Sequence, residues 1–267
     1  MNRIVPGVLL ALFWLLLLAK GSFQLFWAVV VIIGFIGARE YCRMAFAGML
    51  YESDRVLLPM VMISPILAAV FSVRYPATHS FGLLLGLVGV AGYVFGYYTR
   101  LDRPVKILSR GVLGLAYVGF LLSHLVLVRG LDGGGYWLII LAGITAGSDT
   151  GAYWVGSRWG RRKLCPNISP NKTVEGALGG LAGGLIGGIL LSLFFPVSAP
   201  FLMIVTLAAV LAAVGMTGDL IESVMKRGYG VKDSGSLLGG HGGVLDRIDS
   251  LLLAGPFLYY MLMYTGF

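Results

Sequence analysis

The chain has 267 residues, of which 58% are hydrophobic and only 12% are charged, and its mean hydropathy is +0.88. Soluble domains carry about 25% charged residues, so this composition excludes a water-soluble globular protein. The net charge of +8 does not indicate a nucleic-acid partner, because the basic residues follow the pattern of a membrane topology.

Apolar segments of bilayer-spanning length recur along the whole chain. We predict an all-α, polytopic integral membrane protein with about nine transmembrane helices, at residues 4–19, 23–38, 56–73, 79–98, 105–128, 136–156, 175–195, 198–218 and 250–267. The first segment lacks a small-x-small cleavage site after its apolar run, so we interpret it as a span and not as a signal peptide.

The Lys and Arg residues are distributed unevenly between the two sides that nine spans define. Of the 20, 17 fall on the side of the N-terminus, and only Lys20, Arg74 and Arg129 fall on the other. The positive-inside rule therefore predicts a cytoplasmic N-terminus and an external C-terminus. It also places the polar loops 157–174 and 219–249 on the cytoplasmic face of a cell (inner) membrane.

The two halves of the chain differ in polarity. Residues 1–135 hold about five apolar spans with short basic connections, and we predict that they form a scaffold. Residues 136–267 carry acids at the membrane edge and both long polar loops, so we expect the chemistry there. Cys42 and Cys165 have no CxxC spacing, which argues against a disulfide or a zinc site.

Glycine recurs every four residues between 175 and 195, in two neighbouring rows: Gly176, Gly180, Gly184 and Gly188, then Gly179, Gly183 and Gly187. Small residues at this spacing let helices approach closely in lipid. We favour tight helix packing, within a subunit or across a dimer, over a groove that admits acyl chains.

Residues 219–249 concentrate charge in an otherwise apolar chain. If the preceding helix continues, Asp219, Glu222, Ser223 and Lys226 lie on one of its faces, and Asp246 and Asp249 return to the same interface. Ion pairs at a helix end, and capping by one of the last two acids, are the simpler interpretation. We favour a Mg²⁺ site formed by Asp219, Asp246 and Asp249, with room for a second metal ion, because hard cations bind carboxylates and substrate phosphates.

Two further segments fit a phosphate-bearing substrate. The glycines around His241 allow backbone N–H groups to approach phosphate, although a flexible turn would have the same composition. Asp149 lies inside the membrane edge, where an ionisable group needs a partner. Lys172 and Thr173 resemble the end of a Walker A motif, but the required glycines are absent.

Residues 223–249 resemble the signature of phosphatidate cytidylyltransferases (CDP-diacylglycerol synthases), through K-R, K-D-x-G and H-G-G-x-x-D-R-x-D. Residues 148–176 and the segment Gly-Asp-Leu-Ile-Glu-Ser at 218–223 are also similar to that family, so the specific resemblance covers about residues 140–267. Gly239 stands where members often carry proline. The resemblance implies that CTP and phosphatidate give CDP-diacylglycerol and pyrophosphate, in phospholipid biosynthesis, by a homodimer in the lipid bilayer.

The resemblance and the local chemistry together assign roles to two sets of residues. The expected catalytic residues are Asp219, Lys226, Arg227, His241, Asp246 and Arg247. The expected substrate-binding residues are Asp149, Ser169, Lys172, Thr173, Glu175, Ser223, Lys232, Gly242 and Gly243.

Two other functions are compatible with the same residues. A CTP-dependent lipid-alcohol kinase would attack the γ-phosphate instead of the α-phosphate. A cation transporter would use Asp149 and Asp219 as an ion site, although transporters place such acids near the midplane of the membrane. The motif of the CDP-alcohol phosphotransferases is missing from the chain.

Overall fold

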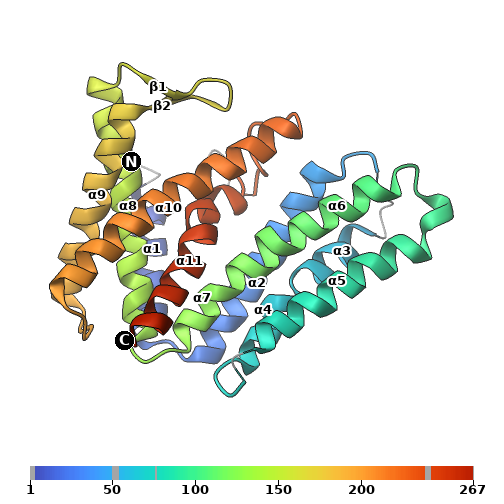
Figure 1. Ribbon diagram of the computed structural model, residues 1–267, viewed down its shortest axis with the longest axis horizontal. Helices are drawn as coiled ribbons and strands as arrows, with labels where there is room; N and C mark the ends of the chain where they lie inside the picture. Colours follow the sequence, from blue (N-terminus) through green and yellow to red (C-terminus); the bar gives the residue numbers. More distant parts are fainter. Residues whose placement is uncertain (1–3, 50–53, 76, 238–241, 267) are drawn as a thin grey trace.

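The computed structural model describes residues 4–49, 54–75, 77–237 and 242–266, and it consists mainly of helices (Figure 1). The first half contains α1 (Ile4–Lys20), α2 (Phe23–Ala45), α3 (Asp54–Met62), α4 (Ser64–Ala68), α5 (Thr78–Gly96), α6 (Pro104–Gly114) and α7 (Leu121–Arg129). The second half contains α8 (Gly134–Trp159), β1 (Lys163–Cys165), β2 (Ser169–Thr173), α9 (Val174–Phe194), α10 (Phe201–Gly228) and α11 (Leu245–Thr265).

Each predicted apolar segment coincides with a helix or with a pair of consecutive helices. Among the described helices, six are long and apolar enough to cross a membrane, or seven if the pair α3 and α4 counts as one bent span. That pair bends by 47° at a break that follows the internal proline Pro59. The chain is therefore an α-helical membrane protein by length and composition.

One part of the described chain departs from the all-α expectation. Strands β1 and β2 form an antiparallel hairpin within the predicted polar loop 157–174. The hairpin projects beyond the ends of α8 and α9, which lie side by side (Figure 1). A second difference is that α10 continues to Gly228, so the first residues of the predicted loop 219–249 are helical.

Of the two glycine rows of α9, one faces α8 and the other lies against both α8 and α10 of the same subunit. A Cβ at Gly183 would overlap the carbonyl group of Gly147 on α8. In the other row, a Cβ at Gly184 would lie 2.6 Å from the Cβ of Ala212 on α10. Glycine thus lets α9 approach α8 and α10 closely, which confirms the packing interpretation within one subunit.

A π-helical turn, η3 (Leu115–Phe120), joins α6 to α7 without a break. It is largely buried, and the hydroxyl group of Tyr117 has no hydrogen-bond partner among the described residues. Helix α7 packs against α11 and α2, so this turn connects the first half of the chain to the helix that begins at Leu245.

Candidate active site

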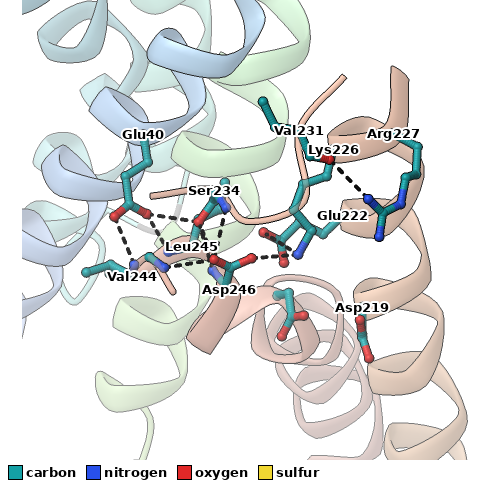
Figure 2. A network of polar contacts seen from close by, with 12 residues as sticks. Glu40, Asp219, Glu222, Lys226, Arg227, Val231, Ser234, Val244, Leu245 and Asp246 are labelled. Carbon is teal, nitrogen blue, oxygen red and sulfur yellow. Dashed lines mark hydrogen bonds and ion pairs between the residues drawn. The ribbon is translucent and has the colours of Figure 1, made fainter. Parts of the chain in front are cut away.

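The last turns of α10 present their polar residues on one face, as the spacing predicted. The ammonium group of Lys226 lies 2.5 Å from Asp246 Oδ1 and 3.4 Å from Glu222 Oε1 (Figure 2). The side chain of Glu222 is fully buried, and neither of its carboxylate oxygens has a hydrogen-bond partner among the described residues. Lys226 is therefore the cation that balances two buried acids.

Asp246, in the first turn of α11, has both carboxylate oxygens occupied. While Oδ1 contacts Lys226, Oδ2 accepts hydrogen bonds from the backbone N–H of Ser234 at 2.9 Å and that of Gly243 at 2.8 Å. The Ser234 hydroxyl lies 2.9 Å from the same oxygen. These contacts fold the segment after α10 back onto the start of α11.

Glu40 on α2 supports the same segment from the other half of the chain (Figure 2). Its carboxylate accepts the backbone N–H groups of Val244 at 3.0 Å and Leu245 at 2.9 Å, and it lies 3.2 Å from the Ser234 hydroxyl. The Glu40 residue is only 2% exposed. It thereby occupies the N-terminus of α11, where unpaired N–H groups favour an anion.

Sequence reasoning missed Glu40 because the second span was predicted to end at residue 38, whereas α2 continues to Ala45. With the correct helix end, Glu40 is an acid on an apolar helix. Such a residue needs a partner, and this requirement would have identified Glu40 as a candidate site residue.

Glycines in the signature segment allow both carboxylates to approach the backbone. A Cβ at Gly235 would lie 2.5 Å from Glu40 Oε1, and a Cβ at Gly243 would lie 2.5 Å from Glu40 Oε2. Gly242 has a φ angle of +77°, which L residues with a side chain rarely adopt. These contacts are an alternative to the phosphate contact that the sequence suggested for Gly242 and Gly243.

A second polar region lies between α8, the hairpin, α9 and α10. It encloses a cavity of about 520 Å³ lined by Asp149, Ser169, Lys172, Thr173 and Asp219 among others. The ammonium group of Lys172 lies 2.6 Å from Asp219 Oδ2, and their side chains are 27% and 32% exposed. The structure thus brings together five of the predicted residues in a pocket that solvent reaches.

The hairpin beside this pocket is held by predicted site residues. The Thr173 hydroxyl accepts the N–H of Gly176 at 3.0 Å and caps α9. The Glu175 carboxylate accepts the N–H groups of Arg161 at 2.9 Å and Arg162 at 3.1 Å. Arg227 donates to the carbonyl of Ile168 at 3.3 Å, which joins α10 to the hairpin.

The remaining predicted residues are placed as follows. Ser223 is half-buried, and Lys232 and Arg247 are exposed. Asp249 lies against α10, because a Cβ at Gly218 would be 2.6 Å from the Asp249 carbonyl oxygen. His241 lies outside the described residues.

Comparison with known proteins shows the family to which the chain belongs. The profile of the Cytidylyltransferase family matches residues 1–265. The chain belongs to the cytidylyltransferase family. It is 35% identical to the phosphatidate cytidylyltransferase of Bacillus subtilis (strain 168) over 270 residues, which cover 98% of this chain and 97% of that protein.

Two staphylococcal relatives align with part of this cytidylyltransferase. The phosphatidate cytidylyltransferase of Staphylococcus saprophyticus is 40% identical over 152 residues, which cover 57% of this chain and 58% of the relative. That of Staphylococcus haemolyticus is 41% identical over 152 residues, with the same shares. The chain is therefore an enzyme of the nucleotidyltransferase class, as the resemblance implied.

The acids of this cytidylyltransferase do not form a preassembled metal site in the part of the chain that the structure describes, since no three His, Cys, Asp or Glu side chains there are grouped for one ion. Their chemistry nevertheless fits a hard divalent cation, because Asp219 on α10 and both Asp246 and Asp249 on α11 supply carboxylate oxygens from two helices that pack on each other. Binding by Asp246 would require the Lys226 ammonium group to leave its Oδ1.

Proposed function

We propose that this protein is a phosphatidate cytidylyltransferase. An oxygen of the phosphatidate phosphate attacks the α-phosphorus of CTP, the bond to the bridging oxygen breaks, and pyrophosphate leaves. The products are CDP-diacylglycerol and pyrophosphate. The observation that carries this proposal is the similarity to the Bacillus subtilis phosphatidate cytidylyltransferase across 98% of the chain.

The pocket supports this reaction through its charges. The attacking phosphate oxygen is already anionic, so the reaction needs no strong general base, and rate enhancement comes from positioning and charge neutralisation. Lys172 and Lys226 each now contact a carboxylate, and each could bind a phosphate oxygen instead when substrate arrives. Arg227 and Arg247 are exposed and would bind pyrophosphate bidentately.

A divalent cation belongs to this proposal. Asp219, Asp246 and Asp249 would hold Mg²⁺, and a second metal ion would share the same acids. When bound, such an ion neutralises phosphate charge that these carboxylates would otherwise repel. Two of those acids also contact lysines, Asp219 with Lys172 and Asp246 with Lys226.

We also propose how the helices cross the membrane, which way the chain is oriented and how many copies assemble. All nine helical segments would cross the bilayer, with the N-terminus and the pocket on the cytoplasmic side of the cell membrane, and two copies would form a homodimer. Residues 1–135 would then serve as a scaffold that supplies Glu40, and residues 136–267 would carry the chemistry. Cysteine labelling from outside the cell at positions 20 and 132, compared with position 100, tests the topology.

The decisive experiment measures magnesium-dependent conversion of CTP and phosphatidate by purified protein in detergent. We expect Asp219→Asn to lower kcat by about 10²–10³-fold, the effect of losing one group that stabilises transition-state charge. Asp132→Asn, an exposed acid outside the pocket, serves as the matched control and should retain activity.

The labelled phosphate distinguishes the reactions. CTP labelled at the α-phosphate should transfer its label to lipid, and CTP labelled at the γ-phosphate should not. Transfer of the γ label to the hydroxyl group of diacylglycerol, supplied in place of phosphatidate, would show a lipid-alcohol kinase. A folded wild type that transfers neither label with any divalent metal would refute the proposal.

A further inference from the structure

Apart from the polar pocket, three arginines surround a separate cavity at the junction of α2 and α3. The cavity has a volume of about 320 Å³ and is lined by Arg39, Arg43 and Arg55, with Phe46 and Ala47. Arg39 and Arg43 lie one helical turn apart on α2, and Arg55 lies in the first turn of α3. The proposed reaction does not use any of these residues.

The positive charges that line this cavity favour a bound anion. No ion pair joins Arg39 or Arg43 to an acid within the described ranges. The guanidinium group of Arg39 lies over the Phe35 ring, with 5.9 Å between Cζ and the ring centroid. Arg39 and Arg43 line the same cavity as like charges that repel each other, and a bound anion would relieve that repulsion.

A phosphate group carried by a lipid matches this lining best. Guanidinium groups bind phosphate oxygens bidentately, and basic pockets between membrane helices bind anionic headgroups. A free phosphate has no apolar part to contact Phe46 and Ala47, whereas a phospholipid continues from its phosphate into glycerol and acyl chains. The cavity also lies at the end of an apolar helix, where headgroups meet protein.

The position of the cavity links it to the signature segment. Glu40, which holds the N–H groups of Val244 and Leu245, is the neighbour of Arg39 on α2. A ligand that fixes the last turns of α2 therefore also fixes the carboxylate that supports the start of α11.

We propose that Arg39 and Arg43 bind the phosphate group of an anionic phospholipid at a site separate from the polar pocket. The lipid stabilises the end of α2 and, through Glu40, the folded signature segment.

Native mass spectrometry of the detergent-solubilised full chain, titrated with phosphatidylglycerol, tests this site. We expect Arg39→Gln and Arg43→Gln each to weaken binding by about fivefold, the contribution of one basic residue beside an anionic lipid. Arg43→Lys should give a smaller loss, because lysine keeps the charge without the bidentate geometry. Arg103→Gln makes the same charge change at an exposed position that does not line the cavity, and it should bind as the wild type does.

Two further arms separate the alternatives. Lys172→Met removes a cation from the polar pocket and should leave the affinity for phosphatidylglycerol unchanged. If Lys172→Met weakened binding as much as Arg39→Gln does, the lipid would bind in the polar pocket and the proposal would be wrong. Inorganic phosphate at the lipid's concentration should not displace it, and displacement would show a site for free phosphate instead. Unchanged binding by the Arg39→Gln/Arg43→Gln double variant, with an unchanged melting temperature, would also refute the site. The assay uses neither CTP nor turnover, so its outcome is independent of the proposed reaction.

Discussion

The acids of this protein fall into two groups that differ in how their charges are satisfied. Glu40 and Asp246 each accept several hydrogen bonds from the signature segment, and both are buried. Asp219 instead contacts the partly exposed Lys172 in an open pocket. The Glu40 carboxylate and the Oδ2 atom of Asp246 hold the backbone in place. Asp219 and the Oδ1 atom of Asp246 contact lysines, and they are available to exchange that partner for a substrate or metal. Carboxylate oxygens at one site can therefore serve architecture and chemistry separately.

The two lysines provide the sharpest test of this comparison. Lys226→Met should lower the free energy of unfolding by about 3–5 kcal/mol, because it leaves Glu222 and Asp246 buried without their cation. Lys172→Met removes a partly exposed ion pair and should cost at most about 1 kcal/mol, although turnover falls. Melting temperatures in detergent and kcat should be measured for both variants. An equal loss of stability in Lys226→Met and Lys172→Met would contradict the distinction between the two ion pairs.

Glu40→Gln should produce the next largest effect. The amide keeps one acceptor oxygen but turns an NH₂ group toward backbone N–H donors, and an unsatisfied buried group of this kind costs about 1–3 kcal/mol. We expect a lower melting temperature together with reduced kcat, since the signature segment loosens. Asp132→Asn is the control for the loss of one negative charge. An unchanged melting temperature for Glu40→Gln would show that α2 does not support the segment.

The sequence predicted the helices of both halves of the chain. It did not predict the contact between Glu40 on α2 and the signature segment. Apolar runs of spanning length locate helices because a bilayer requires them, and the helical spacing of Asp219, Glu222 and Lys226 placed their side chains correctly on α10. Glu40 lies about 200 residues from Val244 and Leu245 along the chain, and nothing local specifies that pairing. The hairpin was also missed, since its strands of three and five residues are too short to show alternation.

A glycine substitution tests the close approach of Glu40. Gly243→Ala would bring a methyl group to 2.5 Å from Glu40 Oε2, and we expect a loss of about 1–3 kcal/mol from the displaced contacts. Gly228→Ala is the matched control, because nothing lies within 4 Å of a Cβ at that position at the end of α10. Equal melting temperatures for the two variants would argue against the tight packing of this segment.

The smallest expected effect concerns the hairpin. In Glu175→Gln the side-chain carbonyl still accepts a hydrogen bond from Arg161 or Arg162, but without the anionic charge. We expect a modest rise in KM with little change in kcat, because Glu175 supports the hairpin that lines the pocket but does not itself line the pocket. Steady-state kinetics with both substrates varied would show this, and a fall in kcat at unchanged KM would assign Glu175 a role in the transition state.

The π-helical turn between α6 and α7 changes which residues face a given direction within one continuous span. An α-helix advances by about 100° per residue, so a turn wide enough for one additional residue rotates everything after it relative to everything before it. The face of α6 that packs on α5 and the face of α7 that packs on α11 are set independently in this way. Deleting a single residue between Leu115 and Phe120 would preserve helicity and hydropathy, yet it would turn one of those two faces toward the lipid.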